Sequence, residues 1–197
     1  MPAAECRRRW DPWTPAEVHD RLEAVTAPWG VVGGWAIDLH LGVVTREHDD
    51  IEIGVPAASF PEVADALAGF EWDSVGDGRI WPYPAYLDRF HQTWLRDPST
   101  GRYHLDVFRE PGDGEVWYFR RDPSSITLAY ADVYTRTADG IPYLVPELVL
   151  LFKARDVQPK DQDDFDRVLP TLGDDRRTRL RRWLAHVNPE HAWLREL

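Results

Sequence analysis

The sequence predicts an α/β (α+β) protein: a mixed β-sheet with flanking helices, followed by a small C-terminal helical region. Up to residue 145, segments that alternate apolar and polar residues lie between segments with helical spacing. From Pro146 onward the pattern is helical only. Apolar residues make up 43% of the chain and ten residues are tryptophan, which indicates a packed globule. We therefore expect a mixed part over residues 1–145 and a helical region over residues 146–197 packed on it.

The first two helices have clear start and stop signals. Thr14 precedes a proline, and Glu17 follows three residues after it, which together form a capping box. Pro28 ends this apolar-striped segment. A second helix is expected over residues 35–41, closed by Gly42.

The remaining elements follow from alternation, turn residues and helical spacing. Strands are expected at residues 31–32, 50–55, 102–108, 115–120, 133–137 and 141–145, and helices at 60–67, 146–156, 158–169 and 174–187. Residues 70–92 are rich in aromatic residues, Pro and Gly, and are assigned only to strands and loops.

The charge balance restricts the partners. Acidic residues outnumber basic ones by 34 to 23, giving a net charge of -11, and the excess lies in residues 1–150. Nucleic acid is therefore not expected as a partner, whereas a small cationic ligand is. The single cysteine, Cys6, excludes an intrachain disulfide framework. With no run of 18 apolar residues and no signal peptide, we expect a cytoplasmic protein without a membrane partner.

Two carboxylates stand out on one predicted strand. Asp50 and Glu52 are two residues apart, so on a strand they project to the same side, about 6–7 Å apart. Two acids on one strand face repel each other, and Mg²⁺, which prefers carboxylate oxygens, would remove the conflict. A solvated strand face is the alternative interpretation.

Two further features favour the metal-binding interpretation over the solvated strand face. Gly33 and Gly34 lie at a strand-to-helix turn, where the backbone can approach a phosphate. Asp106 lies within a later strand and faces away from Leu105 and Val107. A glycine turn, paired acids on a strand and a third acid on a later strand resemble the ordered pattern of the nucleotidyltransferase superfamily that includes DNA polymerase β.

The resemblance is more specific over the first of these segments. Residues 33–38 (Gly-Gly-Trp-Ala-Ile-Asp), 41–42 (Leu-Gly) and 45–52 (Thr-Arg-Glu-His-Asp-Asp-Ile-Glu) resemble the signature of the aminoglycoside 2''-adenylyltransferases and related lincosamide nucleotidyltransferases. Residues 141–154 and 160–165 resemble segments of the wider group. Glu52 stands where the aminoglycoside enzymes usually carry Asp.

The resemblance implies a nucleotidyltransferase fold and a Mg²⁺-dependent reaction. Asp50, Glu52 and Asp106 would be the catalytic and metal-binding residues. Asp106 would complete a second metal site or act as general base on an acceptor hydroxyl. Gly33, Gly34, Arg46 and Lys153 would bind the nucleotide.

Some of these roles have plain structural alternatives. Arg46 either contacts phosphate or pairs with Glu47 or Asp49. Lys153 and Lys160 are the only lysines, and either one of them, in our prediction Lys153, reaches the phosphates or both are ordinary surface residues. Asp38 is expected to hydrogen-bond the loop at residues 45–48 rather than a metal.

The sequence thus predicts an enzyme that transfers a nucleoside monophosphate, AMP from ATP, to a hydroxyl of a small cationic molecule. The first candidate acceptor is an aminoglycoside, because the resemblance is closest there. The alternatives are a lincosamide or other small acceptor, and a non-catalytic member of the fold that only binds a nucleotide. The sequence does not indicate the oligomeric state.

Overall fold

The computed structural model describes residues 8–197, so the expectation based on Cys6 lies outside the described residues. Its main feature is an eight-stranded sheet in the order β10-β11-β1-β2-β6-β5-β3-β4. The strands are β1 (Gly30–Val31), β2 (Glu52–Pro56), β3 (Glu71–Gly76), β4 (Arg79–Pro82), β5 (Gln92–Arg96), β6 (Tyr103–Glu110), β10 (Tyr134–Arg136) and β11 (Pro142–Leu144). The pairs β1–β11 and β2–β6 are parallel and the others antiparallel, which confirms the expected mixed sheet.

A small second sheet lies beside the main one. It is antiparallel, in the order β7-β8-β9, with β7 at Gly112–Asp113, β8 at Val116–Tyr118 and β9 at Thr127–Ala129. The turn that follows β8 carries Arg120 and Arg121, and it becomes important for the site below.

Seven α-helices accompany these sheets in the described part of the chain. They are α1 (Pro15–Arg21), α2 (Gly33–Leu41), α3 (Phe60–Ala66), α4 (Tyr130–Val133), α5 (Pro146–Lys153), α6 (Pro159–Val168) and α7 (Asp174–Val187), with short 3₁₀ turns at Ala57–Ser59, Leu169–Thr171 and Ala192–Arg195. The capping box is confirmed, since the Glu17 amide donates to Thr14 Oγ1 (3.2 Å) and the Thr14 amide donates to Glu17 Oε2 (2.8 Å). Gly42 ends α2 with φ +69°, the left-handed conformation that favours glycine.

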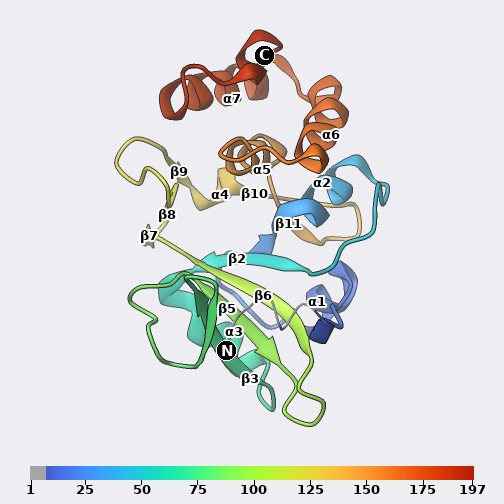
Figure 1. The fold of residues 1–197 in the computed structure, drawn as a ribbon, viewed down its shortest axis with the longest axis vertical. Helices are drawn as coiled ribbons and strands as arrows, with labels where there is room; N and C mark the ends of the chain where they lie inside the picture. Colours follow the sequence, from blue (N-terminus) through green and yellow to red (C-terminus); the bar gives the residue numbers. More distant parts are fainter. Residues whose placement is uncertain (1–7) are drawn as a thin grey trace.

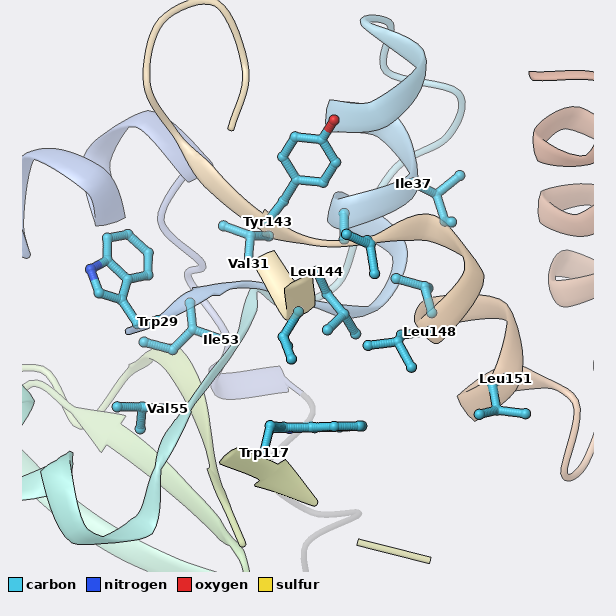
Figure 2. Packing of buried hydrophobic residues seen from close by; sticks show 14 of the residues in the cluster. Trp29, Val31, Ile37, Ile53, Val55, Trp117, Tyr143, Leu144, Leu148 and Leu151 are labelled. Carbon is cyan, nitrogen blue, oxygen red and sulfur yellow. The ribbon is translucent and has the colours of Figure 1, made fainter. Parts of the chain in front are cut away.

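The three C-terminal helices stack at one end of the molecule, beyond the sheet (Figure 1). The chain passes from β11 directly into α5, at the position where the sequence predicts the change to a helical region. Figure 2 shows Val31 of β1, Ile37 of α2 and Leu148 of α5 gathered around this junction. One hydrophobic cluster contains residues of both regions, so the division at residue 145 stays a prediction about architecture.

The aromatic stretch that the sequence assigns only weakly contains the hairpin β3–β4 and runs into β5. Arg109 of β6 is buried and holds the loop before β5: its guanidinium donates to the Leu87 carbonyl (3.0 Å), the Phe90 carbonyl and Thr93 Oγ1 (2.9 Å). Strand β5 therefore takes its place between β6 and β3. Among the described residues, no helix combines the length and the apolar character that crossing a membrane requires.

Candidate active site

A cavity of about 380 Å³ opens between the main sheet and the helical region. Its walls come from the start of α2, the residues leading into β2, the second half of β6, the turn after β8, and the segment from α5 into α6. Six of the seven site residues predicted from the sequence line it: Gly33, Gly34, Arg46, Asp50, Glu52 and Lys153. The fold thus brings together segments that are far apart in the chain.

Asp50 and Glu52 both face this cavity, as their spacing predicts. The strand itself begins at Glu52, so Asp50 lies just before β2 rather than within it. Burial, together with the nearby Asp50 carboxylate, raises the pKa of Glu52 to about 7, against the opposing charges of Lys153, Arg120 and Lys160. Burial also raises the pKa of Asp50, while Lys160 acts in the opposite direction.

Asp106 lies directly beside Glu52 in the sheet. The parallel pairing of β2 and β6 places these two residues in register, so their side chains project from the same face. Asp106 is 1% exposed, and Gln92 Nε2 donates a hydrogen bond to its Oδ2. Within the described residues its Oδ1 has no hydrogen-bond partner. Burial and the neighbouring Glu52 carboxylate hold the pKa of Asp106 well above its ordinary value.

The Gly33–Gly34 turn packs tightly against the same carboxylates. Gly33 has φ +64°, and a Cβ added there would lie 1.9 Å from Glu52 Oε2. A Cβ at Gly34 would lie 2.1 Å from a guanidinium nitrogen of Arg46 and 2.9 Å from His48 Nδ1. The first amides of α2 therefore stand immediately beside the carboxylates, a position that suits a phosphate at a helix N-terminus.

Asp38 holds the loop that carries Arg46, as expected from the sequence. Its Oδ1 accepts from Thr45 Oγ1 (2.6 Å) and its Oδ2 from His48 Nε2 (2.6 Å). The His48 ring also stacks on Trp35, with 4.3 Å between ring centres. Arg46 forms no ion pair with a described residue and donates only to the Glu47 carbonyl (3.2 Å), so its charge is available in the cavity.

The two lysines differ in their surroundings. Lys153 Nζ pairs with Asp161 (2.6 Å) and Asp164 (2.9 Å), both buried, so its charge is already balanced. Lys160 is exposed, lines the cavity and has no carboxylate at ion-pair distance in the described part of the chain. Lys160 therefore has the freer charge for an incoming phosphate, and the nucleotide contact assigned to Lys153 stays a prediction.

Other cavity residues were missed by the sequence reasoning. Phe108 and Glu110 follow Asp106 at a spacing of two, so the alternation of the strand already contained the signal that they share its face. Arg120 and Arg121 also line the cavity. Their place depends on the small second sheet, and no local pattern indicates it.

The acidic residues at the cavity suit a Mg²⁺ ion that is shared with a ligand. No three His, Cys, Asp or Glu side chains among residues 8–197 are gathered closely enough to hold a metal ion by themselves. Mg²⁺ in nucleotide sites usually takes one or two carboxylates and completes its shell with water and phosphate oxygens. Asp50 and Glu52, with the unpartnered Oδ1 of Asp106 in the adjacent strand, fit such a shared site and do not form an all-protein cage.

Comparison with known proteins agrees with this geometry. Residues 16–81, about a third of the chain, match the family model of the aminoglycoside-2''-adenylyltransferases. The expected family resemblance is confirmed. The segment that matches this adenylyltransferase model contains the Gly33–Gly34 turn, Arg46, Asp50 and Glu52, whereas Asp106 and Lys153 lie beyond it. No curated protein matches the chain significantly in sequence.

Solved structures share the fold over most of the chain. The lincosamide antibiotic adenylyltransferase LnuA with bound lincomycin is 24% identical, with a TM-score of 0.53, covering 77% of this chain and 91% of its own. The antibiotic-resistance factor ANT(2'')-Ia in solution is 18% identical, with a TM-score of 0.57 and 92% of each chain covered. The same protein with adenylyl-2''-tobramycin is 17% identical, with a TM-score of 0.58, covering 87% of this chain and 95% of its own. The fold is that of a nucleotidyltransferase.

Proposed function

We propose that this protein transfers AMP from ATP to a hydroxyl of a small cationic molecule, with an aminoglycoside as the first candidate acceptor. The observation that carries the proposal is the Glu52–Asp106 pair: two carboxylates in register on one face of the sheet, directly beside the Gly33–Gly34 turn at the N-terminus of α2. The family match over residues 16–81 supports the same reaction class. The net charge of -11 supports a cationic acceptor.

Separate residues of the cavity would bind the metal and the triphosphate. Asp50 and Glu52, with Asp106, would hold Mg²⁺. When bound, the metal neutralises phosphate charge and lowers the barrier to in-line displacement. The α2 amides at Gly33–Gly34, with Arg46 and Lys160, bind and orient the triphosphate.

The transfer step then follows a simple balance. The acceptor oxygen forms a bond to the α-phosphorus while the bond from that phosphorus to the bridging oxygen of pyrophosphate breaks. The acceptor proton passes to the Asp106 carboxylate, and pyrophosphate leaves with the bonding electrons. Asp106 suits this role because its Oδ1 accepts no hydrogen bond from the described residues and can take the proton.

A lincosamide is the second candidate acceptor. The lincosamide adenylyltransferase is 24% identical to this chain over 77% of this chain's length. Because that enzyme and the aminoglycoside-modifying protein share this fold, the fold does not choose between the acceptors.

The test is a direct assay of the reaction. The purified protein is incubated with Mg²⁺, each labelled nucleoside triphosphate in turn, and a panel of aminoglycosides and lincosamides, while pyrophosphate release is followed. We expect release with ATP and at least one antibiotic, and loss of release in Asp50→Asn and Asp106→Asn variants. Asp132→Asn, an exposed carboxylate of α4 outside the cavity, is the matched control.

The same assay distinguishes the enzymatic proposal from a non-catalytic role in nucleotide binding. If no acceptor supports pyrophosphate release and Asp50→Asn binds nucleotide as tightly as the wild type, the enzymatic proposal is wrong.

A further inference from the structure

Arg120 lines the same cavity as the Gly33–Gly34 turn and is held there by contacts from two other elements. It follows β8, and its guanidinium carbon lies 4.5 Å from the ring centre of Phe108 on β6 and 4.4 Å from that of Phe152 on α5. Cation–π contacts of this kind favour a fixed guanidinium position. Two rings from separate elements therefore hold a residue that belongs to a turn.

Glu110 completes this arrangement. Its Oε1 forms an ion pair with Arg120, and the Glu110 side chain is 5% exposed. A buried carboxylate destabilises the fold unless it is paired, and Arg120 forms the ion pair with Glu110. No step of the proposed reaction uses Glu110, so its burial has another reason. The contacts show one: Glu110 fixes the direction of the Arg120 fork.

The Arg120 guanidinium has N–H donors that make no hydrogen bond to a described residue. A guanidinium has five N–H donors. In the part of the chain that the structure describes, Arg120 donates one hydrogen bond, to Glu110. Its side chain is 20% exposed and lines the cavity, and its positive charge acts on Glu52 across that cavity. A fixed cation with unused donors beside the metal-binding carboxylates is arranged to meet an anion.

We infer that Arg120 binds a phosphate group of the nucleotide in the cavity that the Gly33–Gly34 turn also lines, and that Glu110 is its positioning residue. This inference rests on the proposed function. Arginine suits the role because its planar fork matches phosphate oxygens, and donors set in advance need no reorganisation when charge develops. The phosphates would then be bound jointly by the α2 amides, Lys160 and Arg120, which line the same cavity.

The opposite assignment makes the opposite prediction. Phe108, Phe152 and Glu110 also form a cage that could take an ammonium group of a cationic acceptor, with Arg120 as its occupant in the free protein. In that case removing Arg120 would free the cage and strengthen acceptor binding. The unused N–H donors of Arg120 favour the phosphate assignment. If an acceptor ammonium group displaced Arg120 from the cage, those donors would have no part in binding.

The test measures nucleotide binding apart from turnover. Binding of α,β-methylene-ATP with Mg²⁺ is measured by calorimetry for the wild type and for Arg120→Ala, Arg120→Lys and Glu110→Gln. We expect Kd to rise about tenfold or more in Arg120→Ala, the loss typical of charge-assisted hydrogen bonds. Arg120→Lys should recover only part of it, since lysine lacks the fork. Glu110→Gln should weaken binding by a smaller factor and leave the acceptor KM unchanged.

Controls separate binding from folding and from general charge. Arg155→Ala removes a nearby exposed arginine that does not line this cavity, and it should leave Kd unchanged. If Arg120→Ala fails to fold because Glu110 is left unpaired, the double variant Arg120→Gln/Glu110→Gln buries no unpaired charge and must show the same tenfold loss.

The outcomes are distinct. A Kd within twofold of the wild type in folded Arg120→Ala overturns the inference. A lowered acceptor KM in Arg120→Ala together with a raised one in Glu110→Gln also overturns it and assigns the cage to the acceptor. A wild-type protein that binds no α,β-methylene-ATP contradicts the proposed function itself.

Discussion

Glu52 on β2 and Asp106 on β6 are directly paired across two parallel strands, with both side chains on one face of the sheet. Neither forms an ion pair with a described residue, and Gln92 donates a side-chain hydrogen bond to Asp106. Two carboxylates in this position destabilise the folded chain whenever both are ionised. Such strain is typical of sites where a ligand supplies the missing positive charge.

This pair makes stability depend on pH in a defined direction. The pKa of Glu52 is raised from 4.5 to about 7 in the folded protein. Between these values the folded state binds more protons than the unfolded state, so the free energy of unfolding falls as pH rises from about 4.5 to about 7. We expect Glu52→Gln, measured in EDTA at pH 8, to raise Tm by roughly 2–4 °C for each kcal/mol recovered.

At pH 4 the same variant should melt close to the wild type, because the wild-type Glu52 is then protonated as well. Glu62→Gln serves as the control, since its pKa is lowered by hydrogen bonds from Thr26 and its loss should reduce stability at pH 8 instead. Equal Tm values for wild type and Glu52→Gln at pH 8 would show that the pair costs the fold nothing.

Substitution of Lys153 should mainly affect stability, whereas substitution of Lys160 should mainly affect nucleotide binding. Lys153→Ala leaves Asp161 and Asp164 buried without their cation, which typically costs about 3–5 kcal/mol. Lys160→Ala removes an exposed side chain, so the free energy of unfolding should change by less than about 0.5 kcal/mol. Lys160→Ala should nevertheless raise the KM for ATP by about tenfold, since it removes a charge that faces the phosphates.

Denaturant unfolding and steady-state kinetics on both variants check this. Lys153→Arg, which keeps the charge and the fold, then asks whether Lys153 also contacts the nucleotide. An unchanged ATP KM in folded Lys153→Ala together with an unchanged KM in Lys160→Ala would remove both lysines from phosphate binding.

Much of the fold follows from local signals in the sequence. The capping box at Thr14, the terminating Gly42 and the alternation around Asp106 each act within a few residues, and each is confirmed by the structure. The bond from the loop to Asp38 could also be expected, because a polar residue in a mostly apolar helix needs a partner.

The rest depends on contacts between distant segments. Arg176 and Arg179 of α7 pair with Glu147, which is fully buried on α5. Arg120 reaches the cavity only because β8 joins a separate small sheet. No spacing within one segment reports either contact. The strand pattern of the sequence predicts the carboxylates of the site, but it does not predict that Arg120 lines the same cavity.

Asp38 should control the shape of the loop that carries Arg46. Asp38→Asn replaces one carboxylate oxygen with an amide group and removes the negative charge, so the charge-assisted 2.6 Å hydrogen bond from His48 Nε2 is weakened. We expect a loss of about 1–3 kcal/mol and faster tryptic cleavage after Arg46. Thr45→Val removes only the hydrogen bond from Thr45 Oγ1 to Asp38 and should show a smaller change in both. Cleavage after Arg46 at the wild-type rate in Asp38→Asn would mean that the loop is held by the Trp35–His48 stack alone.

Gly33 and Gly78 offer a matched pair for the role of the turn. Both have a left-handed backbone, φ +64° and φ +69°, so an alanine at either site carries the same strain of roughly 1–2 kcal/mol. A Cβ at Gly78 meets no described atom within 4 Å, whereas a Cβ at Gly33 would lie 1.9 Å from Glu52 Oε2. We expect Gly78→Ala to lower Tm and keep the kcat for pyrophosphate release. Gly33→Ala must displace Glu52 and should lower kcat by about a hundredfold or more, since small misplacements of reacting groups have effects of this size. Equal kcat values in the two variants would separate the turn from the chemistry.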